Sequence, residues 1–280
     1  MTLKNQVLSR TGKKTILYDV FIKEDEKKKP LVIFCHGYKG FKDWGVWDLV
    51  ANHFKSAGCL LVKFNFSHNG GTVENPIDFP DLEAFAENNY TKELDDLEDM
   101  LSFLLSDKFE FSQQINQEKV NLIGHSRGGG ICIIKASEDD RINKLITWAS
   151  VADFGRRSST TGDLEQWRKD GVKYVLNGRT KQQMPHNFQF YDNFKANEKR
   201  LHIESSERQL AIPHLIIHGK EDDAVLFSEA EELHDWGKQT ELFPVDGANH
   251  VFNSKHPWDS NIIPEALEIA INKSLSFISS

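Results

Sequence analysis

Ser126 is the residue whose neighbours most clearly indicate chemistry. It lies in Gly124-His125-Ser126-Arg127-Gly128, which fits the G-x-S-x-G pattern of a nucleophile elbow. The spacing has a mechanical reason, because a serine held on a sharp turn between a strand and a helix needs neighbours whose Cβ would not collide. Apolar residues 120–123 precede the motif and residues 129–136 follow it, as a strand-turn-helix context requires. We predict that Ser126 is a nucleophile; the simpler interpretation is a glycine turn.

A serine hydroxyl needs a base to take its proton, so this hypothesis requires a histidine and a carboxylate later in the chain. Asp222 comes just after a short apolar block, residues 214–217, and is our candidate for the acid. Its neighbours Glu221 and Asp223 remain alternatives. His250 lies on a glycine-containing loop after another short strand, where its imidazole can reach both groups, so it is our candidate for the base.

Two backbone N–H groups are candidates for stabilising the oxyanion that forms when a serine attacks an acyl carbon. Residues 36–40, His-Gly-Tyr-Lys-Gly, follow the first apolar block, so the N–H of Tyr38 can face the N–H of Arg127. A plain strand-ending turn is the simpler explanation of the His-Gly pair. Four other histidines near expected strand ends or loops are interpreted as structural: His36, His125, His218 and His256.

The elements that must position these residues alternate regularly along the chain. Short continuous apolar blocks, typical of strands covered on both faces, occupy residues 31–35, 59–64, 119–123, 144–148 and 214–217. Helical patterns lie between them, such as the stripe of Leu94, Leu97, Leu101 and Leu104, and Asp43 is expected to cap an earlier helix. Residues 3–8 and 15–22 flank a glycine turn and predict a hairpin. The alternation predicts an α/β fold with a mostly parallel sheet flanked by helices.

One interval is longer than a single crossover helix requires. Residues 151–213 separate two core strands, and structureless loops of that length are uncommon. We therefore predict a core made of residues 1–150 and 214–280, with an inserted cap over residues 151–213. The cap would hold six aromatic side chains, Trp167, Tyr174, Phe188, Phe190, Tyr191 and Phe194.

Composition excludes several classes of function. The formal net charge of −8 disfavours nonspecific nucleic-acid binding, and no apolar run approaches the roughly 20 residues of a membrane span. The amino terminus lacks a signal-peptide pattern. The three cysteines, Cys35, Cys59 and Cys132, are interpreted as reduced core residues. Both observations predict a cytoplasmic location. Phosphate-loop, dinucleotide and metal-ligand motifs are absent, so we expect no cofactor and no metal.

The segments around His36-Gly37, Ser126, Asp222 and His250, in that chain order, resemble the α/β-hydrolase family. Within it the chain is similar to the serine esterase and peptidase-like group that contains cinnamoyl (feruloyl) esterases and serine aminopeptidase-type hydrolases. The resemblance implies a mostly parallel eight-stranded sheet, an inserted cap and hydrolysis of an ester, thioester or amide through an acyl-serine. Serine at position 126 disfavours dehalogenase or epoxide hydrolase chemistry. Residues 64–70 depart from an Asp-x-Arg-Gly-x-Gly sequence common in relatives, so the local supporting network is expected to differ.

The expected function is therefore a serine hydrolase acting on a carboxylic ester or thioester of a small-molecule acyl substrate. One alternative is a peptidase or amidase whose cap holds a free amino terminus through acidic groups, for which Glu165, Asp170 and Asp192 are candidates. Another is a binding protein that keeps the fold without turnover. Arg156 and Arg157 could receive an anionic group, although a solvated charge pair is the simpler interpretation. The sequence does not indicate the oligomeric state.

Overall fold

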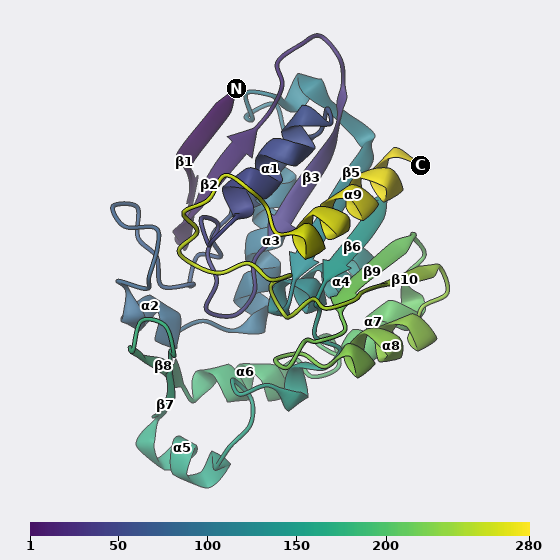
Figure 1. The fold of residues 1–280 in the computed structure, drawn as a ribbon. Helices are drawn as coiled ribbons and strands as arrows, with labels where there is room; N and C mark the ends of the chain where they lie inside the picture. Colours follow the sequence, from purple (N-terminus) through teal and green to yellow (C-terminus); the bar gives the residue numbers. More distant parts are fainter.

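An eight-stranded sheet forms the centre of the computed structural model, which describes residues 1–280 (Figure 1). The strand order is β1-β2-β4-β3-β5-β6-β9-β10. The amino-terminal hairpin β1/β2 is antiparallel and joins β4 antiparallel, whereas every pair from β4 to β10 is parallel. The predicted fold class and hairpin are thus confirmed. The strands are β1 (Thr2–Arg10), β2 (Lys13–Phe21), β3 (Lys29–Cys35), β4 (Leu60–Phe64), β5 (Ile115–His125), β6 (Lys144–Trp148), β9 (His214–Gly219) and β10 (Thr240–Val245).

Helices cover both faces of this sheet. Side chains alternate across β3, so Leu31 and Ile33 pack into one apolar cluster and Val32 and Phe34 into another. The second cluster includes residues of α1 (Trp47–Ser56) and α9 (Glu265–Ser279), which lie in front of the sheet in Figure 1. The first includes residues of α3 (Tyr90–Leu104), α4 (Arg127–Glu138) and α8 (Phe227–Trp236). No helix combines the length and the apolar character that crossing a membrane requires.

The interval between β6 and β9 contains elements of its own. They are η2 (Phe154–Arg156), α5 (Leu164–Asp170), β7 (Val172–Leu176), β8 (Gln183–Asn187), α6 (Gln189–Ala196) and α7 (Ile203–Gln209). Strands β7 and β8 form a small antiparallel sheet beside α2 (Leu82–Ala86), below the ends of the main strands in Figure 1. Trp167, Phe188, Phe190 and Phe194 are buried in the same apolar cluster as α3 and α4, whereas Tyr174 is exposed.

The expected helix cap at Asp43 is wrong. Helix α1 begins at Trp47, its N-cap residue is Val46, and no side chain caps it. The carboxylate of Asp43 instead binds the ammonium groups of Lys4, Lys42 and Lys63. Because these partners come from distant or buried positions, local spacing gave no sign of them. Three charged donors hold a carboxylate more strongly than the N–H groups of one helix turn.

Candidate active site

Ser126 lies on the turn between β5 and α4, in a conformation that non-glycine residues rarely adopt. Its φ is 57° and its ψ is −121°. The flanking glycines permit the tight packing of this turn. A Cβ at Gly124 would lie 2.4 Å from the carbonyl oxygen of Gly128, and a Cβ at Gly128 would lie 2.4 Å from that of Cys35 in β3. The motif therefore places the serine hydroxyl at the carboxyl end of the central strands.

The structure brings Ser126, His250 and Asp222 into one hydrogen-bonded row. His250 Nε2 lies 3.0 Å from Ser126 Oγ, and His250 Nδ1 lies 2.7 Å from Asp222 Oδ2. With Nδ1–H donating to the carboxylate, Nε2 is free to accept the hydroxyl proton. Of the three neighbouring acids considered from the sequence, Asp222 is the buried one, whereas Glu221 and Asp223 are exposed.

Further hydrogen bonds keep Asp222 in place as an anion. Its Oδ1 accepts from the backbone N–H groups of Ala224 and Val225, each at 2.9 Å. His218 Nε2 lies 3.2 Å from Oδ2 and also donates to the carbonyl of Val225 at 2.8 Å. Burial alone raises the pKa of Asp222, but the hydrogen bonds from His218 and His250 hold that pKa well below its usual range. An ionised Asp222 can stabilise a protonated His250 beside it.

Two backbone donors beside Ser126 have no acceptor within the protein. The N–H of Tyr38 makes no hydrogen bond, and that of Arg127, the first residue of α4, has no acceptor either. The loop carrying Tyr38 passes close to the serine, because a Cβ at Gly37 would lie 2.8 Å from Ser126 Cβ. Neither N–H group forms a hydrogen bond within the fold, so both can donate to an oxygen of a ligand.

Residues 64–70, which depart from the sequence common in relatives, support this loop through side-chain amides. Asn65 Oδ1 accepts from the N–H of Lys42 at 2.6 Å, and Asn69 Nδ2 donates to the carbonyl of Gly40 at 3.3 Å. Ser67 hydrogen-bonds Asp96 of α3 through both its N–H, at 2.7 Å, and its hydroxyl, at 3.0 Å. The supporting network therefore combines the amides of Asn65 and Asn69 with the hydroxyl of Ser67 and the carboxylate of Asp96.

The four histidines interpreted as structural each hydrogen-bond a backbone group. His125 Nε2 donates to the carbonyl of His250 at 2.9 Å, and His36 Nε2 accepts from the N–H of Phe66 at 3.2 Å. His256 accepts from Gly45, and His218 donates to Val225 as described above. Burial lowers the pKa of His125 to about 3 and that of His36 to about 4. Both rings therefore stay neutral and fix the loops around Ser126.

Two cavities meet at Ser126, His250 and Tyr38. The smaller, of about 110 Å³, is lined by the indoles of Trp44 and Trp47. The larger, of about 410 Å³, extends along Val151 and Val225. An acyl carbon at Ser126 would thus have room on two sides, one for the acyl chain and one for the leaving group. The sequence analysis did not assign Trp44 and Trp47 to the site. The one available signal was that they follow His36-Gly37 closely in the sequence.

The acidic candidates for binding an amino terminus do not lie at this site. Glu165, Asp170 and Asp192 are exposed, and none lines either cavity. Arg156 and Arg157 do line the larger cavity. Arg156 pairs with Glu232 at 2.9 Å and with Asp153 at 3.3 Å, and Arg157 pairs with Glu229.

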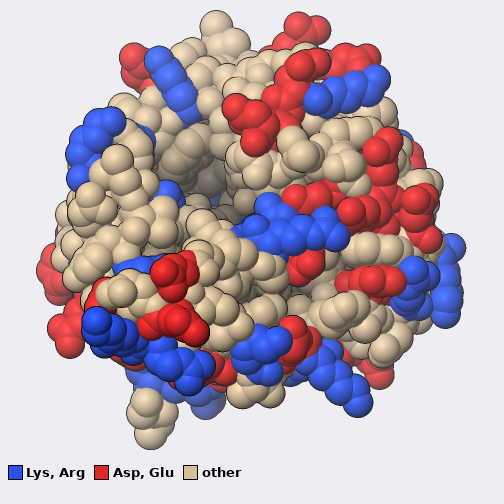
Figure 2. Space-filling view, turned by 90° about the horizontal axis from the view of Figure 1, so that it is seen from below, with Lys and Arg blue, Asp and Glu red and all other residues tan.

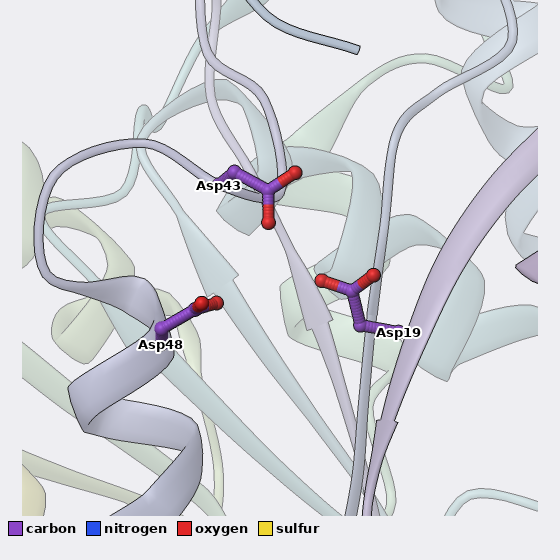
Figure 3. Close-up of side chains that lie close together, drawn as sticks. All are labelled: Asp19, Asp43 and Asp48. Carbon is purple, nitrogen blue, oxygen red and sulfur yellow. The ribbon is translucent and has the colours of Figure 1, made fainter. Parts of the chain in front are cut away.

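A second cluster has the carboxylate spacing of a metal site but holds ammonium groups. Asp19, Asp43 and Asp48 turn their carboxylates toward a common centre (Figure 3). Lys63 Nζ lies 2.7 Å from Asp19, 3.0 Å from Asp43 and 2.7 Å from Asp48. Lys4 also contacts all three carboxylates. The lysines supply the positive charge that a cation would bring, so this donor set does not fit a metal ion.

Comparisons with known proteins identify the family and the fold of the chain. The family described as alpha/beta hydrolase fold matches residues 30–183, more than half of the chain. An Escherichia coli protein described as an uncharacterized 31.7 kDa protein in the traX-finO intergenic region is 26% identical over 156 residues. That match covers 56% of this chain and 49% of the relative, so the chain spans about half the length of the curated relatives it matches.

Solved structures share the fold over nearly the whole chain. Est1E from Butyrivibrio proteoclasticus, solved with ferulic acid bound, has a TM-score of 0.74 at 17% identity and covers 98% of each chain. A putative hydrolase from Agrobacterium vitis has a TM-score of 0.72 at 16% identity and covers 99% of this chain and 98% of its own. At such identities the likeness concerns the fold. Together with the sequence match over residues 30–183, it establishes that this chain belongs to the alpha/beta hydrolase fold family.

Proposed function

We propose that the protein is a serine hydrolase that cleaves a carboxylic ester or thioester of a small-molecule acyl substrate through an acyl-serine. The observation that carries this proposal is the row of Ser126 Oγ, His250 and Asp222, with contacts of 3.0 and 2.7 Å. Membership of a hydrolase family and structural likeness to esterases support it.

In the first half of the reaction, Ser126 Oγ attacks the acyl carbon while His250 Nε2 takes the hydroxyl proton. The carbonyl oxygen becomes an oxyanion, which accepts hydrogen bonds from the N–H groups of Tyr38 and Arg127. Asp222 stabilises the imidazolium that has formed. The intermediate collapses when His250 gives its proton to the leaving oxygen or sulfur, which departs as an alcohol or thiol and leaves an acyl-serine.

In the second half, water attacks the acyl-serine while His250 again takes a proton. The same two N–H groups stabilise the second oxyanion, and the proton returns to Ser126 Oγ as the carboxylic acid leaves. Every proton and electron pair is accounted for by the side chains present and water. No cofactor takes part in this scheme.

Two alternatives give different expectations. A peptidase acting on free amino termini would need a carboxylate in the cavities at Ser126, and neither cavity is lined by one. A binding protein without turnover would have no use for an unpaired oxyanion site and a strained serine, which favours the enzyme. A cytoplasmic location remains a prediction that cell fractionation would test.

The direct test is labelling of the purified protein with a fluorophosphonate, followed by mass spectrometry to locate the adduct. We expect one adduct at Ser126, and none in the Ser126→Ala variant. A protein that is folded by circular dichroism but takes up no label, even with small fluorophosphonates that enter narrow cavities, would contradict the proposal and favour the binding protein. Screening esters against aminoacyl amides would then separate the esterase from the peptidase.

A further inference from the structure

The side chain of Arg127, the residue after the nucleophile, is a buried cation surrounded by aromatic rings. Only 5% of the residue is exposed. The guanidinium carbon lies 4.4 Å from the ring centroid of Tyr38, 5.1 Å from that of Tyr90 and 5.5 Å from that of Phe190. These rings hold the guanidinium in place and attract its charge, but they do not satisfy its N–H donors.

Most of these donors are unused. Arg127 makes one side-chain hydrogen bond, from Nη1 to Glu93 Oε1 at a long 3.3 Å. Its Nε and Nη2 have no partner in the protein, yet they are not among the unpaired polar atoms that the fold seals from solvent. They therefore keep a small exposed surface on a side chain that is 7% exposed, and the residue lines the larger cavity at Ser126. Because buried donors are nearly always paired, accessible unpaired ones at the wall of a cavity indicate a place for an acceptor.

The charged residues that line that cavity are all basic. Arg127, Arg156 and Arg157 contribute to it, and no aspartate or glutamate does. The carboxylates that pair with these arginines are not among the residues that line the cavity: Glu93 for Arg127, Asp153 and Glu232 for Arg156, and Glu229 for Arg157. Figure 2 shows a hollow on the face that carries the inserted elements, with basic side chains reaching its rim. The cavity thus presents cationic donors although the whole chain carries a net charge of −8.

We propose that the substrate carries a carboxylate, which binds Arg127 in the larger cavity while the scissile carbonyl lies at Ser126. This inference rests on the proposed function for the bond that is cleaved. A guanidinium edge presents parallel N–H donors that match the two oxygens of a carboxylate. Arg157, whose side chain is 18% exposed, contributes a second positive charge to the same cavity. The indoles of the smaller cavity accommodate the uncharged part of the ester.

Binding is tested first, without turnover, on the Ser126→Ala variant. Calorimetry would compare monomethyl adipate with methyl hexanoate and methyl ε-aminohexanoate, which share the acyl skeleton and end in a carboxylate, a methyl group and an ammonium. We expect the carboxylate ester to bind roughly 10-fold or more tightly than the neutral one, and the amino ester least tightly. Equal binding of the carboxylate and neutral esters would overturn the inference.

The role of Arg127 itself is tested by removing its charge together with that of its buried partner. The double variant Arg127→Gln with Glu93→Gln avoids leaving Glu93 as an unpaired buried anion. In the Ser126→Ala background we expect it to lose the preference for monomethyl adipate over methyl hexanoate. Arg157→Gln, which changes a less buried side chain, is expected to reduce the preference by a few-fold. Preference retained in both variants would show that other groups recognise the ester.

A matched control is Arg200→Gln, which removes the same charge from a residue between α6 and α7 that pairs with the last residue of α4. Arg200 pairs with Glu138 at 2.8 Å and does not line the cavity at Ser126. It should keep the full preference. Turnover of both esters by the wild-type protein is measured separately. If the wild type hydrolyses both esters but binding shows no preference for the carboxylate ester, the carboxylate site is contradicted and the proposed function is not. If the carboxylate ester binds preferentially but neither ester is hydrolysed, the proposed function is contradicted and the carboxylate site is not. Binding of hexanoyl glycolate, whose carboxylate is on the alcohol part, is compared with that of monomethyl adipate, whose carboxylate is on the acyl part. The tighter ligand shows which part of the substrate carries the carboxylate.

Discussion

The surroundings of Ser126 and the cluster of Asp19, Asp43 and Asp48 are both polar and both contain fully buried charged side chains, but their hydrogen-bond donors differ in how many find a partner within the protein. In the cluster, Lys42 Nζ binds Asn5 at 2.6 Å, Asp19 at 2.8 Å and Asp43 at 2.5 Å, so all three ammonium donors are used. Beside Ser126, the N–H of Tyr38 and two nitrogens of the Arg127 side chain have no partner. Saturated polar groups stabilise the fold, and unsaturated ones remain available to a ligand.

The two regions also differ in the conformation of the backbone. Ser126 is held at a φ of 57°, which costs conformational energy that the packing of β5 and α4 must offset. Asp19 lies within β2, where the extended backbone is unstrained. Substitutions in the first region are therefore expected to change rates, and substitutions in the second to change stability.

The largest expected effect follows from Ser126→Ala. Removing the nucleophile should lower kcat for ester hydrolysis by about 10⁴-fold or more, because no other group in the row can form the acyl intermediate. The free energy of unfolding, measured by urea denaturation, should change little, since the hydroxyl makes its contact at the cavity wall. Hydrolysis that persists at the wild-type rate would remove Ser126 from the mechanism.

Asp222→Asn should lower kcat by about 10⁴-fold, because an amide favours the wrong tautomer of His250. Asp223→Asn is the matched control, since the neighbouring side chain is exposed and makes no contact with the imidazole. Steady-state kinetics of the two variants measures the difference. The opposite result, with Asp223→Asn the slower enzyme, would move the acid by one residue.

In the cluster, Asp19→Asn should lower the free energy of unfolding by about 3–5 kcal/mol. The reason is that Lys42 and Lys63, both buried, would lose the carboxylate that lies 2.8 and 2.7 Å from their ammonium groups. Glu204→Gln, which breaks an exposed pair with Arg208, is the control and should cost no more than about 1 kcal/mol. Urea denaturation of both variants would test this, and equal losses would contradict the contrast between buried and exposed pairs.

The strands and the motif at Ser126 were predictable because their signals are local. Each apolar block is continuous over a few residues, as a strand covered on both faces requires, and the block at residues 119–123 runs directly into the elbow. The order of Ser126, Asp222 and His250 could also be read from the sequence, and the structure brings their side chains together. Their catalytic roles remain predictions.

Features that depend on distant partners were not predictable. The sequence predicts a helix cap at Asp43 because nothing local indicates Lys4 of β1 and Lys63 of β4, which bind its carboxylate. The spacing after β9 favoured Asp222 as the acid, but only the structure shows that its side chain is buried while those of Glu221 and Asp223 are exposed. The sequence indicates a role only for the backbone N–H of Arg127, since nothing local shows that its guanidinium lines a cavity with most donors unpaired.

The smallest expected effect is a difference between the two regions in how their contribution to the free energy of unfolding depends on pH. Burial lowers the pKa of His125 to about 3, below the value near 6.5 of an unfolded chain, so the unfolded state binds more protons as the pH falls. His125 should therefore subtract about 2 kcal/mol from the free energy of unfolding between pH 7 and pH 5. The pKa of Asp43 is held well below its usual range by Lys63 and Lys42 despite burial, so the cluster loses its contribution only at much lower pH. In His125→Gln, which keeps an N–H for the carbonyl of His250, urea denaturation at the two pH values should give a smaller difference than in the wild type. An unchanged difference would mean that His125 is protonated in the folded protein as readily as in the unfolded chain. The Ser126 region would then not lose stability at a higher pH than the Asp43 cluster.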